Sequence, residues 1–193
     1  MQRLLVETKA MFDTFEKWDV FLELCKLKRE IVEDWYSALF VGMKNRFLKD
    51  DIVAGWSFNA KTYNTYVWYL SKYGPLSIGI WFEGCFQLNM WADANTCNLD
   101  KTKELLNTDP CFQPILTAFG NIDGRFVDGY IVKGNLSWEL EGYYGRPEEE
   151  RLAYYTYKET DHMIAQVSTI IDRFRKDERV TALLEKLNEE AKK

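Results

Sequence analysis

The hydrophobic pattern of the first third of the chain predicts a long helix. Between residues 13 and 48, apolar side chains recur at spacings of three and four, which is typical of a helix with one buried stripe. Asp13 is the predicted N-cap, and Glu16 occupies the reciprocal position of a capping box. Because no proline or glycine precedes Gly42 in this stretch, we expect one helix, or two that join near Lys28. The stripe expected to be buried consists of Phe15, Trp18, Leu22, Cys25, Ile31, Trp35, Leu39 and Met43.

The next stretch, residues 56–91, is rich in aromatic residues and predicts a β-sheet. It holds four of the seven tryptophans, and aromatic side chains favour pleated, half-buried surfaces. Gly74-Pro75 is a strong turn signal within it. More aromatic surface is concentrated here than one sheet face needs, so either helices cover both faces or one face is a contact surface. The expected strands are 56–58, 63–70, 77–82 and 86–91.

The same pattern predicts the register of the last two strands, which flank Glu83-Gly84-Cys85. A three-residue loop brings apolar residues opposite one another, whereas a two-residue loop would mix apolar and polar residues on one face. We therefore expect Ile80 and Leu88 to be core residues that face one another. The other predicted pairs are Phe82 with Phe86 and Ile78 with Met90. The residues that point to the opposite face in this register are Trp81, Gln87, Asn89 and Trp91.

Short elements follow the aromatic stretch. Two short helices are expected within residues 99–119, the first capped by Asn98 or Asp100 and the second ended by Gly120. Two strands are expected within residues 130–140. In the second of them apolar and polar residues alternate, so we expect it to have one solvent-exposed face.

Residues 147–190 are predicted to be helical. Pro147 suits the first helical position, and the glutamates after it suit the positive end of the helix dipole. Lys176-Asp177 is a candidate break before a short amphipathic end helix. A chain of 193 residues fits one domain. The predicted fold class is α+β: one domain, residues 1–193, with a mainly antiparallel sheet of about five strands packed by long N- and C-terminal helices.

Composition and charge narrow the function classes. Hydrophobic residues make up 47% of the chain and charged residues 28%, which is an ordinary globular balance. The net charge is −5, so the chain lacks the broad basic field that gives non-specific affinity for nucleic acid. Glu7 and Lys9 interrupt any signal-peptide core, and no run approaches the roughly 20 apolar residues of a membrane span. We expect a cytoplasmic protein that binds neither nucleic acid nor a membrane.

The cysteine and histidine content predicts no metal or cofactor site. The four cysteines, Cys25, Cys85, Cys97 and Cys111, form no CxxC pair, and a zinc site would need close pairs or histidine partners. The one histidine, His162, lies mid-helix beside acidic residues and is interpreted as structural. No phosphate-binding loop, nucleophile elbow or nuclease-type acid-x-lysine arrangement occurs near the predicted sheet. We therefore name no catalytic residue, no cofactor and no metal ligand.

Two alternative sites stay open. Carboxylates occur at the ends of predicted elements, and a converging pair would suit acid–base catalysis. A basic cluster near the candidate break would suit an accessory nucleic-acid module, although acidic residues are interleaved with it. The carboxylates are Asp50, Asp51, Asp93, Asp100, Glu139 and Glu141, and the basic residues are Arg173, Arg175, Lys176 and Arg179.

The aromatic face of the predicted hairpin is the main candidate binding site. Trp81 and Trp91 bracket Gln87 and Asn89, and aromatic rings beside amides suit sugar, base or peptide ligands. The competing interpretation is that a long helix packs over them, with Trp91 more open than Trp81. Our primary hypothesis is a non-enzymatic cytosolic interaction protein that binds or inhibits an unidentified protein partner. Small acidic proteins encoded by phages or mobile elements, and toxin-neutralising proteins, belong to that class. The alternatives are an enzyme with a carboxylate-based site and the nucleic-acid module.

Overall fold

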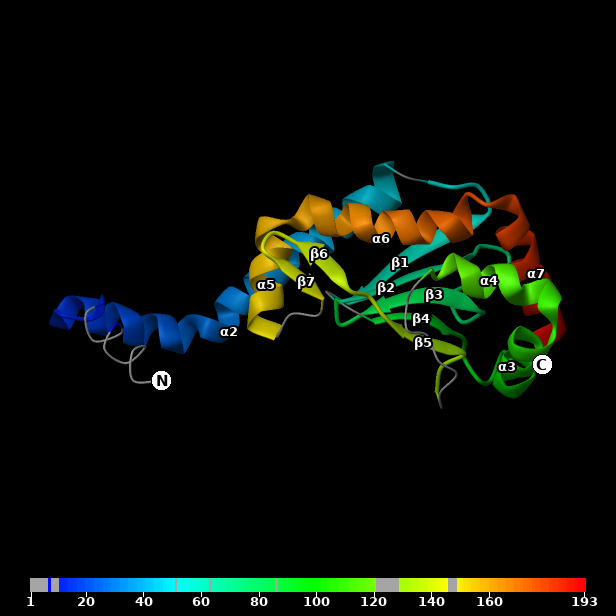
Figure 1. Ribbon diagram of the computed structural model, residues 1–193, viewed down its shortest axis with the longest axis horizontal. Coiled ribbons are helices and arrows are strands. Elements are labelled where there is room, and N and C mark those ends of the chain that lie inside the picture. Colours follow the sequence, from blue (N-terminus) through cyan, green and yellow to red (C-terminus); the bar gives the residue numbers. More distant parts are fainter. Residues whose placement is uncertain are drawn as a thin grey trace.

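The computed structural model describes residue 7 and residues 11–50, 52–62, 64–85, 87–120, 129–145 and 149–193. These residues contain a five-stranded antiparallel sheet in which every strand lies beside its neighbour in sequence, in the order β1-β2-β3-β4-β5 (Figure 1). The strands are β1 (Trp56–Thr62), β2 (Thr65–Leu70), β3 (Gly79–Glu83), β4 (Gln87–Trp91) and β5 (Val132–Asn135).

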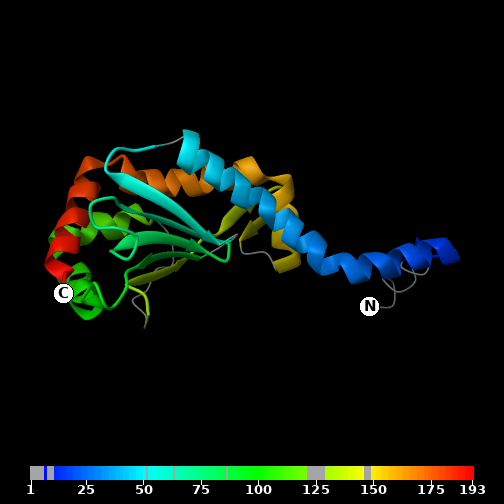
Figure 2. The same ribbon diagram turned by 180° about the vertical axis from the view of Figure 1, so that it is seen from behind.

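Helices that precede and follow the sheet in the sequence complete the fold, which confirms the predicted α+β class. The long helix α2 packs against α5 and α6, and α7 crosses one end of the sheet (Figures 1 and 2). The helices are α2 (Phe15–Lys44), α3 (Leu99–Thr108), α4 (Gln113–Ala118), α5 (Glu149–Lys158), α6 (Thr160–Arg175) and α7 (Glu178–Ala191). A π-helical turn, η1 (Asn45–Asp50), extends α2, and a 3-10 turn, η2 (Pro110–Phe112), precedes α4.

The observed helix caps agree in part with the caps predicted from the sequence. The N-cap of α2 is Thr14, whose side chain accepts from the backbone N–H of Lys17. The prediction of Asp13 is wrong by one residue, because Asp13 instead forms an ion pair with Lys17. Asn98 caps α3 as predicted. Asp177 caps α7, which confirms the break predicted between the last two helices. Pro147 lies outside the described residues.

A second, smaller strand pair lies outside the main sheet. β6 (Trp138–Leu140) pairs with β7 (Tyr143–Gly145), so the predicted strand that contains β6 does not extend the main sheet. The alternation predicted for it is confirmed, since Trp138 and Leu140 are buried and Glu139 is exposed. The Trp138 indole N–H donates to the Cys85 carbonyl oxygen at 2.8 Å, which attaches the pair to the β3–β4 turn.

One face of the main sheet forms the hydrophobic core. Alternate strand residues on this face are almost fully buried, as the two-residue period of a strand requires. Phe40 of α2 packs on Tyr66, and Phe47 of η1 packs edge-on against Trp68, with ring centroids 4.9 Å apart. The central residues of this face are Trp68, Ile80, Phe82, Leu88 and Met90.

The register of the β3–β4 hairpin corrects the prediction. Ile80 faces Met90 and Phe82 faces Leu88, so Ile80 and Leu88 are both core residues but are not directly opposite one another. Glu83 remains in β3 and pairs with Gln87, which moves the three-residue loop one position along the chain. Gly84 and Cys85 make the turn with φ angles of 57° and 58°. Because the pairing shifts by two residues, the predicted faces are unchanged; Phe86 and Tyr63 lie outside the described residues.

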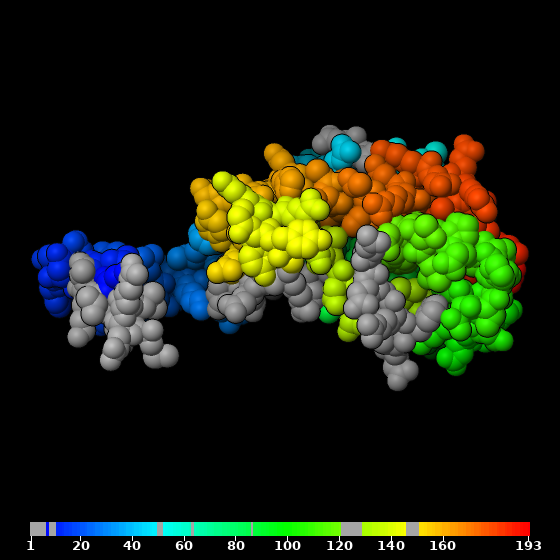
Figure 3. Space-filling view, viewed as in Figure 1, coloured from blue at the N-terminus to red at the C-terminus, as the bar shows by residue number. Residues whose placement is uncertain are grey.

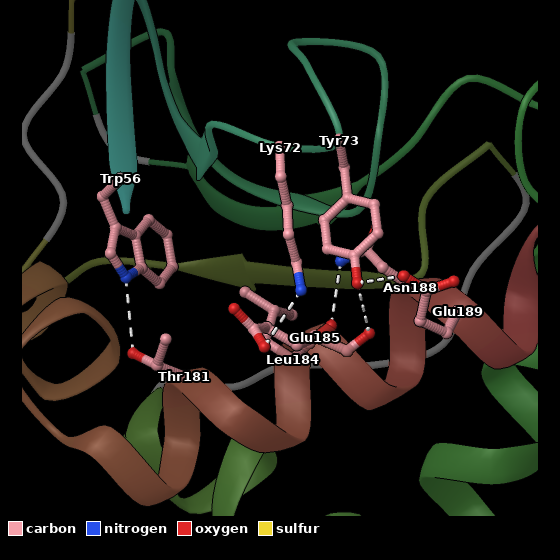
Figure 4. Close-up of polar contacts among 8 residues, drawn as sticks. All are labelled: Trp56, Lys72, Tyr73, Thr181, Leu184, Glu185, Asn188 and Glu189. Atoms are coloured by element: carbon pink, nitrogen blue, oxygen red, sulfur yellow. Dashed lines mark hydrogen bonds and ion pairs between the residues drawn. The ribbon is translucent and has the colours of Figure 1, made fainter. Parts of the chain in front are cut away.

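Polar contacts fix α7 across the end of the sheet (Figure 4). The buried Asn188 side chain accepts from the Ile78 backbone N–H at 3.0 Å and donates to the Leu184 carbonyl oxygen at 2.9 Å. The Tyr73 hydroxyl donates to Glu189 at 2.6 Å, and the Trp56 indole N–H donates to Thr181. These bonds connect the start of β1 and the β2–β3 connection to one helix.

The buried thiol of Cys85 and the buried phenol of Tyr66 predict a loss of stability in alkali. Burial raises the pKa of the Cys85 thiol from 9.0 to about 12. Burial, followed by the nearby Cys85, raises the pKa of Tyr66 well above its usual value. The unfolded chain therefore loses these protons at lower pH than the folded chain. The contribution of Cys85 to the free energy of unfolding is complete below pH 9 and is lost as pH rises from 9 to about 12.

Denaturant unfolding measured between pH 8 and pH 11 tests this expectation. The free energy of unfolding should fall with pH, and Cys85→Ala should make that fall shallower. Cys25→Ala, which removes an exposed thiol, is the matched control and should leave the slope unchanged. An equal slope in the Cys85→Ala variant would show that the buried thiol does not cause the effect.

Candidate functional site

The sheet face opposite the core carries the four residues predicted as a binding site. Trp81 of β3 and Trp91 of β4 lie with their ring centroids 4.4 Å apart. Asn89 pairs directly with Trp81, and Gln87 lies two residues further along β4 on the same face. Trp81 is only 6% exposed, whereas Trp91 is half-buried. The alternation of the strands therefore brings the predicted residues together.

Lys61 of β1 joins this pair of indoles, although no pattern in the sequence pointed to it. Its Nζ lies 4.1 Å from the Trp81 ring centroid and 5.7 Å from the Trp91 ring centroid. The β1–β2 register is irregular between Ala60 and Thr62, and a bulge of this kind re-aims a side chain. An ammonium group over an indole face is worth about 0.5–2 kcal/mol. The two indoles thus contact a cation that belongs to the same chain.

A buried polar network lies beside the indoles. The Asn89 amide donates to Glu83 at 2.9 Å and accepts from the Gly134 backbone N–H at 3.3 Å. The Tyr130 hydroxyl donates to the same Glu83 carboxylate at 3.1 Å. Burial, and then the adjacent Glu83, raises the pKa of Tyr130. The network holds Asn89 and Glu83 to one another, so neither polar group is presented as a freely rotating ligand contact.

The ring and cation contacts of both indoles come from β1, β3 and β4. The long helices pack against the other face, where Phe40 and Phe47 meet Tyr66 and Trp68. This face is thus distinct from the core, and its use as a binding site stays a prediction.

The structure separates the predicted basic cluster. Arg175 is buried at the end of α6, where its guanidinium lies 4.9 Å from the Phe47 ring centroid and pairs with Asp172. Lys176 pairs with the same Asp172 at 2.8 Å. Arg173 and Arg179 are exposed and line a hollow of about 520 Å³ between α4 and the start of α7. Lys176 lines a shallow hollow of about 840 Å³ together with Arg173 and Arg179, so three of the four residues share a surface and Arg175 alone is buried away from it.

The acidic candidates do not gather into a metal site in the part of the chain that the structure describes. Asp93 accepts from the Asn95 backbone N–H in a turn, and Asp100 lies in the first turn of α3. His162 has a structural contact, because its Nε2 donates to the Glu139 carbonyl oxygen at 2.7 Å. Asp51 lies outside the described residues.

The most exposed apolar surface lies on the first half of α2. Figures 1 and 2 show this half extending away from the other elements, and Figure 3 shows it as a narrow arm. We call residues 11–30 the projecting segment. The sequence predicted that Phe15, Trp18, Leu22 and Cys25 are buried, and this is wrong: Phe15 is 77% exposed and Trp18 is 44% exposed. The helical period identified an apolar face correctly, but the described residues leave this face exposed.

Apolar side chains lie on both sides of the projecting segment. Spacings of four and three place Phe15, Trp18 and Leu22 along one side, while Val20, Leu24 and Leu27 follow the opposite side. The second stripe is the signal that the sequence reasoning missed, since a helix that is apolar all round is normally buried. The exposed large apolar residues of the segment are Met11, Phe15, Trp18, Val20, Leu22, Leu24 and Leu27.

Within the described residues, no helix has the length and apolar content needed to cross a membrane. No protein-family model matches the chain, and comparison with curated proteins and with solved structures finds no match.

Proposed function

We propose that this chain is an interaction protein that binds a protein partner, and that the projecting segment is its docking element. The supporting observation is the concentration of exposed apolar side chains on a helix that has left the core. At about 200 Å² for one large side chain, the exposed fractions of the seven residues amount to roughly 700 Å². This area is divided between two opposite sides of the segment, and the largest apolar patch on a typical monomer covers about 300–600 Å² in total.

The segment is organised for recognition without support from the core. Two of its ion pairs lie one turn apart along the helix: Lys26 with Glu23, and Arg29 with Glu33. Each such pair stabilises an isolated helix by about 0.2–0.5 kcal/mol. The continuation of the same helix into the core supplies the nucleus that an isolated helix lacks. A preformed helix binds with a smaller loss of conformational entropy than a disordered segment.

Charge favours a protein over a membrane surface as the occupant. Helices that lie on membranes carry mainly Lys and Arg on their polar face. Residues 13–23 instead contain four acidic residues and one lysine, a net charge of −3. Mixed charge around aromatic and aliphatic anchors is the composition of a helix that docks in a protein groove or against another helix.

Photo-crosslinking of the full chain inside the producing cell tests the docking element. A photoreactive side chain at Trp18, which is 44% exposed, should give a discrete crosslinked species that mass spectrometry identifies. The matched control is Val41, which is 53% exposed on the same helix outside the projecting segment. Equal crosslinking at Trp18 and Val41, or none at Trp18, would contradict the proposed docking element.

A further inference from the structure

We infer that the partner of the projecting segment is a second copy of this chain, packed against it as an antiparallel helix pair. This inference rests on the proposed function and names its partner.

The seam for such a pair is the heptad stripe of α2. Phe15, Trp18, Leu22 and Cys25 follow one another at spacings of three, four and three, which is the repeat of a helix-to-helix seam. The same repeat continues beyond Arg29 into the core. There Val32 is half-buried, and Tyr36, Leu39 and Met43 are buried. The stripe that packs against this chain's own helices therefore runs on, uncovered, along the projecting segment.

The seam supplies a large part of the apolar area that a stable pair needs. The exposed fractions of Phe15, Trp18 and Leu22 correspond to roughly 320 Å² per copy. A standard interface buries about 800 Å² per partner. Somewhat more than half of such an interface is apolar, or roughly 450–500 Å².

Charge sets the direction of the pair. Residues 13–23 carry a net charge of −3, and residues 24–29 carry +3, from Lys26, Lys28 and Arg29. Two parallel copies would bring like charges together, whereas two antiparallel copies bring the acidic part of each segment to the basic part of the other. The antiparallel arrangement also places the two folded bodies at opposite ends of the pair. The segment has room for this because α2 extends beyond α5 (Figure 2).

The heptad seam, together with the position at which α2 enters the folded part of the chain, fixes the register of the antiparallel pair. Full overlap of residues 15–32 in both copies places Leu22 beside Cys25 of the second copy. It also places Asp19, which flanks the seam, beside Lys26 of the second copy. Asp19 and Lys26 are both exposed in the single chain, so both are accessible for such a pair.

Sedimentation equilibrium of the full chain tests the second copy as partner. We expect twice the chain mass of 22.8 kDa, and Leu22→Glu should give a monomer with an unchanged circular dichroism spectrum. Val41→Glu, the matched control, should keep the dimer. A monomeric native chain, or a dimer that persists in Leu22→Glu, overturns this inference. A monomer whose Trp18 still crosslinks to another protein retains the proposed function, so the two failures are distinguishable.

A charge exchange tests the direction. Asp19→Lys and Lys26→Asp should each weaken dimerisation several-fold, since each creates two like-charge contacts in an antiparallel pair. The double variant restores opposite charges across the pair and should return the dissociation constant to near the native value. In a parallel pair Asp19 and Lys26 would not lie beside one another, so the exchange would restore nothing. A double variant no tighter than the single variants overturns the antiparallel arrangement.

Discussion

Replacing Trp68 with alanine is expected to lower the free energy of unfolding by about 3–5 kcal/mol. The Trp68 side chain is 1% exposed at the centre of the core face of the sheet. Its ring centroid lies 4.9 Å from that of Phe47 and 5.2 Å from that of Phe58. Alanine removes the contacts that join β2 to η1 and β1, and leaves a cavity that a rigid sheet cannot close. Urea denaturation followed by circular dichroism measures the loss.

Two further variants separate burial from residue type. Trp91→Ala removes a half-buried tryptophan from the opposite face and should cost no more than about 2 kcal/mol. Trp68→Phe should cost less than Trp68→Ala, because the buried indole N–H has no hydrogen-bond partner among the described residues. Equal losses for Trp68→Ala and Trp91→Ala would mean that both faces of the sheet contribute equally to the core.

Replacing Asn188 with leucine is expected to cost about 2–4 kcal/mol, because the change leaves buried backbone groups without a partner. Asn188 is 3% exposed and accepts from the Ile78 backbone N–H at 3.0 Å. Leucine has the same branched arrangement of heavy atoms and is not smaller than asparagine, so the loss does not come from a cavity. It should also loosen α7 from the start of β3, which amide exchange at Ile78 would detect.

The control for this prediction is Asn107→Leu in α3. Asn107 is exposed, and substitutions at such sites usually stay within about 0.5 kcal/mol of neutral. A loss for Asn188→Leu as small as that for Asn107→Leu would show that the Asn188 bonds do not stabilise the α7 contact.

The elements and faces of the sheet could be predicted because they depend on local periodicity. Successive residues of a strand point to opposite faces of the sheet. A register shift by an even number of residues therefore leaves Trp68 and Trp81 on opposite faces. The register itself depends on backbone conformation at the turn. Cys85 has a positive φ of 58°, which is uncommon for a residue other than glycine, and no sequence rule would have placed it there.

Part of the candidate site could also be predicted, because it depends on the same alternation of strand residues. Alternation brought Trp81, Trp91, Asn89 and Gln87 together. Lys61 was missed because its position depends on an irregularity in β1, which pattern alone does not reveal. The same limit explains the error at Phe15 and Trp18. Helical periodicity shows that a stripe is apolar, but not whether the cover comes from the same chain.

The continuity of α2 has a mechanical consequence. A helix that is unbroken from Phe15 to Lys44 behaves as a stiff rod of about 45 Å, not as a tether. Its inner half packs closely on α6, since a Cβ added at Gly42 would lie 2.5 Å from the Ile164 Cδ1 atom. Tension or torque applied to the outer half therefore reaches Phe47 and the aromatic rings of β1 and β2 without being absorbed by a flexible joint. Whatever holds the outer half also sets the direction in which the sheet faces.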